Sequence, residues 1–264
     1  AELAALRAEL QPNAPDLQAL DREALIGLLP CLRPEVITEG LLDPGAADID
    51  VHALHQGYLR GVRQQGGTLR CDSEVQGLRR EGGRWLLQLP QGATVAARRV
   101  VNAAGAWADV LAHRAGAATV GLVPKRRTAF TFPVPAGMDA AHWPAAIGVA
   151  ENWYFKPDAG QLLGSPANAD PVQPHDVIAE ELDVAMAISH IEAVSQLTIR
   201  RPTHTWAGLR SFVADGEFVI GKDDAPEGLF WLAAQGGYGI QSAAGYALLA
   251  RNLLLGEPLD ERLR

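Results

Sequence analysis

The 264-residue sequence predicts a mixed α/β (α+β) protein, built as one large domain or two interleaved ones. Hydrophobic residues make up 48% of the chain, which is enough for a sizeable buried core. An amphipathic stretch at 51–67 precedes short strand-like runs separated by Gly-Gly and Gln-Gly pairs. Two further phrases, at 100–109 and 229–245, each place an apolar strand before a turn of small residues and a helix.

Composition excludes several classes of partner. A formal net charge of -8 argues against a nucleic-acid surface, which needs clustered Lys and Arg. No apolar run approaches the length of a membrane span, and the first residues lack the blocks of a signal peptide. Cys31 and Cys71 are too few for a zinc motif or a disulfide framework, which is typical of a reducing compartment. We expect a cytoplasmic protein that acts on a small molecule.

The first third of the chain predicts helices and then a meander. The opening 35 residues read as helical, with Asp21 capping a second short helix that ends before Pro30. The segment 35–50 predicts a strand that leads into a glycine-rich turn, and Asp50 caps the amphipathic helix at 51–67. Three short strands follow between 68 and 105.

The remainder alternates extended segments and helices. A helix is expected at 106–115 and extended structure from 121, followed by a strand pair that turns at 157–160 and a helix at 180–197. The segment 201–221 predicts a hairpin turning at Asp215-Gly216. A buried strand at 229–234 then leads through a glycine turn into a helix that begins near Ile240 and stops near Gly256.

The two strand–turn–helix phrases are the strongest candidates for a site. In VVNAAGAWAD the small residues let a phosphate or a ribityl chain approach the backbone, although a tight corner packed with alanines explains the phrase equally well. In LFWLAAQGGYGIQSAAG the glycines leave the backbone open before a helix N-terminus, which favours negative charge. Here too the alternative is a glycine corner needed for packing.

With PKRRTAF, WYFKPDAG and TWAGLRSFVADGEFVIG, these phrases resemble the superfamily of FAD-dependent D-amino-acid oxidases, sarcosine and glycine oxidases and related dehydrogenases. Phrase by phrase they are most similar to the bacterial D-arginine dehydrogenases. The resemblance implies an FAD/NAD(P)-binding, glutathione-reductase-like fold with an antiparallel mixed-sheet substrate domain of D-amino-acid oxidase type. It assigns 1–50 to a helical region and the entry to the substrate domain, 51–119 and 211–264 to the FAD-binding domain, and 120–210 to the substrate-binding domain.

The resemblance also implies the site residues. Arg127, Tyr154 and Arg210 bind the substrate carboxylate, with Arg126 as the fallback for Arg127, and the backbone carbonyl of Gly237 accepts the substrate amine. The residues placed beside FAD are Val75, Asn102, Ala103, Ala104, Gly105, Trp107, Gly236, Gly237, Tyr238, Gly239, Ile240 and Gln241.

The implied reaction is hydride transfer from the Cα of a D-amino acid to flavin, followed by hydrolysis to a 2-oxo acid and ammonia. Planar guanidinium groups match a carboxylate bidentately, so two arginines would orient the Cα–H bond. No side-chain acid or base is needed if the amine binds neutral, so we assign no catalytic side chain. The electrons pass to oxygen or to another acceptor, between which the sequence does not choose.

The sequence departs from the superfamily in one respect. It has no G-x-G-x-x-G after an N-terminal strand, the phrase that binds the ADP half of FAD, so we expect that segment to be missing. Two alternatives therefore stay open: amine oxidation of the glycine or sarcosine oxidase type, and a truncated, non-catalytic fragment that binds no FAD. Exposed apolar surface would make a homo-oligomer possible. His52 and His55 read as helix surface and no metal is expected.

Overall fold

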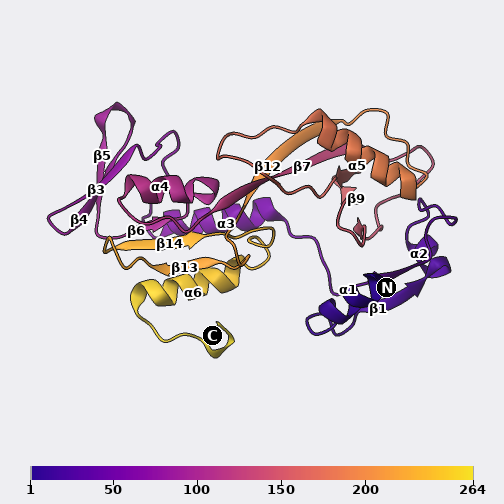
Figure 1. The fold of residues 1–264 in the computed structure, drawn as a ribbon, viewed down its shortest axis with the longest axis horizontal. Coiled ribbons are helices and arrows are strands. Elements are labelled where there is room, and N and C mark those ends of the chain that lie inside the picture. Colours follow the sequence, from indigo (N-terminus) through magenta and orange to yellow (C-terminus); the bar gives the residue numbers. More distant parts are fainter. Residues whose placement is uncertain (1, 264) are drawn as a thin grey trace. The chain divides into compact units, whose positions relative to one another are not determined.

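The computed structural model describes residues 2–263 and divides the chain into two compact units (Figure 1). Unit 1 contains the residues up to Ala47, Arg126–Asp170 and His175–Leu209. Unit 2 contains Asp48–Lys125, Pro171–Pro174 and the residues from Arg210 onward. Each unit is thus assembled from segments that are far apart in the sequence.

Unit 1 begins with α1 (Glu2–Leu10), β1 (Gln18–Asp21), α2 (Arg22–Leu28) and β2 (Glu39–Leu42). The predicted cap of α2 is present, because the Asp21 carboxylate accepts a hydrogen bond from the Ala24 N–H at 2.9 Å. The predicted strand after the second helix is β2. Strand β1, which pairs antiparallel with β2, was not predicted, because its four residues carry no alternating pattern.

The main sheet of unit 1 has the strand order β11-β7-β10-β9-β8, and β12 also pairs with β7. Its elements are β7 (Val123–Pro133), β8 (Ala146–Ile147), β9 (Tyr154–Asp158), β10 (Gln161–Ser165), β11 (Asp170–Pro171) and β12 (His204–Phe212). Helix α5 (Glu181–Val194) packs against β9 and β10. The core between them is formed by fully buried side chains that include Phe130, Phe155, Leu162 and Ile191.

The strand pair predicted at 153–168 is the β9–β10 hairpin. Its two turn residues, Ala159 and Gly160, have φ of 46° and 80°, as a tight hairpin turn requires. The helix predicted at 180–197 is α5, which is shorter by one residue at its start and three at its end.

Unit 2 contains α3 (Val51–Gln64), capped as predicted by Asp50, and the antiparallel meander of β3 (Gly77–Glu81), β4 (Arg84–Gln88) and β5 (Thr94–Ala97). Its second sheet has the order β13-β14-β6, with β14 parallel to β6. The remaining elements are η1 (Pro90–Gly92), β6 (Val100–Asn102), η2 (Gly105–Trp107), α4 (Ala108–Arg114), β13 (Val219–Lys222), β14 (Leu229–Ala233), α6 (Ala243–Leu255) and η3 (Glu261–Leu263). Helix α6 lies along β13 (Figure 1).

Three local expectations were wrong. The predicted hairpin at 201–221 does not form: β12 pairs with β7 and β13 pairs with β14, although the chain does turn at Gly216, with φ of 79°. The third strand expected before residue 105 is two strands, since β5 pairs with β4 and β6 pairs with β14. The last helix begins at Ala243, not near Ile240, because residues 236–242 form successive turns.

Candidate functional site

Two turns leave the same edge of the second sheet in unit 2. In the parallel register of β6 and β14, Asn102 lies opposite Trp231, so the turns that follow the two strands begin side by side. Asn102 is fully buried, and its Nδ2 donates to the Ala108 carbonyl at 2.8 Å, which fixes the first turn to the start of α4. The carboxyl ends of neighbouring parallel strands are where open α/β sheets bind ligands.

The second turn, residues 234–242, needs glycine because other groups lie very close. A Cβ on Gly236, whose φ is 54°, would lie 2.9 Å from the Phe212 ring, and one on Gly239 would lie 2.6 Å from the Gln235 side chain. The Tyr238 hydroxyl, which donates to the Gly216 carbonyl, anchors the turn.

This turn also presents backbone donors. Within residues 2–263, no acceptor is present for the N–H groups of Gly237, Gly239, Ile240 and Gln241. The Tyr238 hydrogen bond therefore anchors the turn, while these four N–H groups stay available to a ligand.

Arg210 lies against this second turn. Its side chain is half-buried, and its Nη1 is 3.0 Å from where a Cβ on Gly237 would stand. Among the residues that the structure describes, the Arg210 guanidinium has no carboxylate or hydrogen-bond partner. Nearby, the Lys125 ammonium lies 4.8 Å from the centre of the Phe212 ring, a cation–π contact. Two cations beside available N–H groups make this part of unit 2 suited to an anion.

Arg127 and Tyr154 share one face of the unit 1 sheet. Tyr154 pairs with Ser165 on β10, and Leu163, two residues before Ser165, pairs with Thr131 on β7. Because side chains alternate along a strand, Arg127 and Tyr154 lie on the face opposite to the Phe130 and Phe155 core. The structure thus places these two predicted residues on one face of the unit 1 sheet, and Arg210 beside Gly237 in unit 2.

Arg126, the fallback for Arg127, lies on the core face. It is 9% exposed, and its Nε donates to Asp183 at 3.0 Å, with Asp170 at 3.5 Å and Glu180 also paired to it. Burial lowers the pKa of Arg126, but the hydrogen bond and charge of Asp183 and the charges of Glu180 and Asp170 outweigh it, so the pKa is raised. Arg126 thus has a set of acidic partners within unit 1.

The residues predicted to touch the cofactor all lie in unit 2, but not all at one place. Ala103, Ala104, Gly105 and Trp107 follow β6, and Trp107 is 44% exposed. Val75, which precedes the meander, packs against a buried cluster that includes Trp85 and Leu229. Its carbonyl accepts a hydrogen bond from Arg114 at 2.6 Å.

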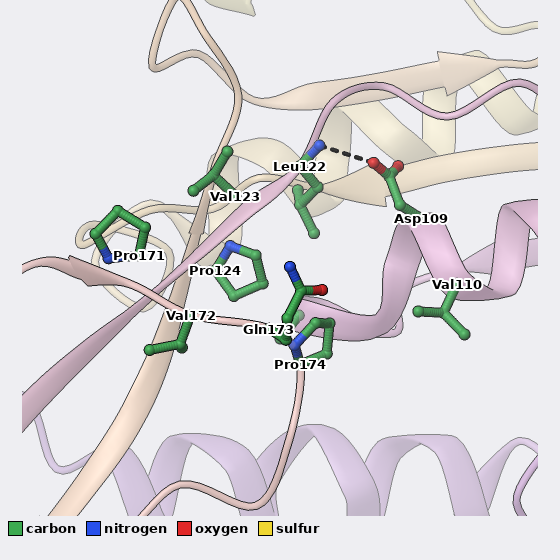
Figure 2. A pocket seen from close by; sticks show the side chains of 10 residues that line it. Asp109, Val110, Leu122, Val123, Pro124, Pro171, Val172, Gln173 and Pro174 are labelled. Carbon is green, nitrogen blue, oxygen red and sulfur yellow. Dashed lines mark hydrogen bonds between the residues drawn. The ribbon is translucent and has the colours of Figure 1, made fainter.

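A cavity of about 500 Å³ in unit 2 was not predicted from the sequence (Figure 2). It lies between the start of α4, residues 122–124 and residues 171–174, and most of its wall is proline and valine. Its only acidic group is Asp109, whose two carboxylate oxygens accept the N–H groups of Val120 at 3.0 Å and Leu122 at 2.8 Å. Asp109 is the last residue of the VVNAAGAWAD phrase. Its role in holding residues 120–122 depends on hydrogen bonds to residues 11 and 13 positions away, which the phrase alone does not indicate.

Residues 2–263 contain no group of three or more His, Cys, Asp or Glu side chains arranged to hold a metal ion. In the same residues, no helix is both long and apolar enough to cross a membrane.

Comparison with known proteins adds independent information. The family model for FAD dependent oxidoreductases (DAO) matches residues 1–253. The mitochondrial dimethylglycine dehydrogenases of Rattus norvegicus and Mus musculus are each 26% identical over 269 residues; the alignments cover 93% of this chain and 31% and 30% of those proteins. The chain therefore spans about a third of the length of these relatives.

Solved structures share the fold. Glycine oxidase from Geobacillus kaustophilus has a TM-score of 0.79 at 21% identity, over 92% of this chain and 64% of that one. Iminodiacetate oxidase from Chelativorans sp. BNC1 has a TM-score of 0.79 at 22% identity, over 98% and 69%. L-alpha-Glycerophosphate oxidase from Mycoplasma pneumoniae, solved with FAD bound, has a TM-score of 0.82 at 22% identity, over 91% and 65%. The predicted mixed α/β fold of this type is thus confirmed, and the chain spans about two thirds of these structures.

Proposed function

We propose, since the chain belongs to the DAO family of FAD-dependent oxidoreductases, that it forms part of an enzyme that oxidises an α-amino acid at the carbon bearing nitrogen. The observation that carries the proposal is Arg210. A half-buried guanidinium without an anionic partner among residues 2–263, packed on the backbone of a glycine turn, is suited to a substrate carboxylate. Desolvating such a group is costly unless a ligand compensates it.

The residues of unit 2 fit the cofactor of this family, which is FAD. The N–H groups of residues 237 and 239–241 and the nearby start of α6 would favour the negative charge that collects on a reduced flavin. The small residues that follow Asn102 leave its turn open to close approach, and no neighbour lies within 4 Å of a Cβ built on Gly105. When bound, FAD supplies the acceptor for the electron pair and the hydrogen that leave the substrate carbon.

The chain's own residues would bind and orient the substrate. In unit 2, Arg210 holds the carboxylate and the Gly237 carbonyl accepts an N–H of the amine; in unit 1, Arg127 and Tyr154 are the residues that the family resemblance assigns to the carboxylate. A neutral amine needs no side-chain base, so we assign no catalytic acid or base. Water then hydrolyses the imine product to a 2-oxo acid and ammonia. We propose a D-amino acid as substrate, D-arginine first, and the cytoplasm as the compartment.

A second candidate substrate is an N-methylated glycine. It is supported by the similarity of 93% of this chain to the dimethylglycine dehydrogenases. Such a substrate keeps the carboxylate but has no side chain, so the same Arg210 contact would serve it, and sarcosine also keeps an N–H for the Gly237 carbonyl.

The test is a visible spectrum of the purified chain with added FAD, followed by anaerobic additions of D-arginine, glycine, sarcosine and N,N-dimethylglycine. Loss of the flavin absorption band at about 450 nm after addition of one of these four amines identifies the substrate class. Arg210→Met should abolish the response, and Arg70→Met, which changes an exposed arginine of unit 2, should keep it. A chain that takes up no flavin, or a flavin that none of the four amines reduces, would contradict the proposal.

A further inference from the structure

The loop after β10 is tied to Arg127 through Asn168. The backbone carbonyl of Asn168 accepts a hydrogen bond from the Arg127 Nε at 2.6 Å. Its side-chain Oδ1 accepts the backbone N–H of Thr128 at 2.9 Å, on the residue next to Arg127. The side chain and the backbone of one residue thus hold two successive residues of β7, which fixes both the strand position and the direction of the arginine side chain.

Asn168 is itself anchored to a buried acid. Its Nδ2 donates to the Asp183 carboxylate at 3.0 Å, and Asp183 is only 3% exposed. The same carboxylate accepts the Thr128 hydroxyl at 2.6 Å and the Arg126 Nε at 3.0 Å. Because every partner of this acid is itself buried or half-buried, the network is shielded from competing water.

The backbone of the loop is also built for this contact. Ala167, the residue before Asn168, has φ of 51°, a conformation that residues other than glycine rarely adopt. The Ser165 hydroxyl stabilises it, since it donates to the Thr128 carbonyl at 2.6 Å and accepts the Ala167 N–H at 3.1 Å. A strained residue that the surroundings hold in place is commonly found beside functional groups.

We infer that Asn168 is a positioning residue for substrate recognition: anchored on Asp183, it holds the Arg127 guanidinium in the direction that binds the substrate carboxylate. The inference rests on the proposed function, which assigns Arg127 to the carboxylate. Asn168 acts only through Arg127, so its contribution to carboxylate binding should vanish when Arg127 is absent.

The first test is a double-mutant cycle. Asn168→Ala, Arg127→Ala and the double variant are compared for the KM and kcat of the substrate that reduces the flavin, and for the Kd of its 2-oxo acid. We expect Asn168→Ala to raise KM and Kd about tenfold in the parent and less than about twofold in the Arg127→Ala background. Asn13→Ala, at an exposed asparagine of unit 1, is the matched control and should change neither. Equal losses in the two backgrounds would overturn the inference.

The second readout needs no activity. With ¹⁵N-labelled arginine, the Nε–H resonance of Arg127, identified by its disappearance in Arg127→Lys, should exchange slowly with water. Asn168→Ala should accelerate that exchange at least about tenfold, while Asn13→Ala leaves it unchanged. Unchanged exchange in Asn168→Ala would overturn the positioning role. Faster exchange, in a chain that oxidises none of the tested amines, would instead refute the proposed function and leave the positioning of Arg127 intact.

Discussion

Gly237→Ala should weaken substrate binding with little effect on folding. The new Cβ would lie 3.0 Å from Nη1 and 3.5 Å from Cζ of Arg210, whereas ordinary contact begins at 3.4 Å, so the guanidinium must retreat by at least 0.4 Å. Since none of the described residues pairs with Arg210, the side chain yields before the backbone does. A shift of this size at a bidentate site should raise KM about tenfold and change the unfolding free energy by less than about 1 kcal/mol.

The assay compares KM for the substrate that reduces the flavin with the midpoint of urea unfolding. Gly61→Ala is the matched control, because no neighbour lies within 4 Å of a Cβ at that helical position of unit 2. It should leave KM unchanged and stabilise the chain by about 0.5–1 kcal/mol. The reasoning is refuted if Gly237→Ala binds substrate as tightly as the parent, or if the two variants lose the same affinity.

Further variants test the structural roles of Gly236, Asp183 and the two cysteines. Gly236→Ala should lower the unfolding free energy by about 1–2 kcal/mol in urea titrations, since φ is 54° there; an unchanged midpoint would contradict this. Asp183→Ala should cost about 3 kcal/mol in the same titrations, because it leaves the buried charge of Arg126 with only its more exposed acids; a loss below about 1 kcal/mol would show that those acids suffice. Burial raises the pKa of the Cys31 thiol from 9.0 to about 11, so a thiol reagent at neutral pH should modify only the exposed Cys71, and Cys71→Ser should not react. As the folded pKa of Cys31 is the higher one, its contribution to stability should be complete below pH 9.0 and fall as the pH rises toward about 11; the slope should be absent in Cys31→Ala.

The features that the sequence predicted well are those determined within a few residues. Asp21 and Asp50 cap their helices because a carboxylate reaches an N–H three residues ahead in any context. Gly256 ends α6 with φ of 72°, again a local requirement. The turn at 159–160 is equally local, as is the one at 82–83, and both join strands that pair as an antiparallel hairpin.

The wrong predictions concern which strands pair with each other. Asp215 and Gly216 do form a turn, but a turn signal does not say whether the strands on either side pair with each other. Strand β12 (His204–Phe212) instead pairs with β7 (Val123–Pro133), far earlier in the chain. For the same reason β5 and β6, only two residues apart, join different sheets. Asn168 and Asp183 were not predicted because their roles depend on contacts with residues 40–57 positions away.

The pair Arg126 and Arg127 shows how the sheet resolves what the sequence leaves ambiguous. The two arginines are adjacent in the sequence, so no sequence pattern says which of them binds substrate. On a strand that single step reverses the face, which places Arg126 over α5 with the Asp183 carboxylate and Arg127 on the side away from the core. Both are nevertheless coupled, since Asp183 accepts from Arg126 and, through Asn168, orients Arg127. A change of the buried acid should therefore alter both folding and substrate binding, whereas a change at Asn168 should alter substrate binding far more than folding.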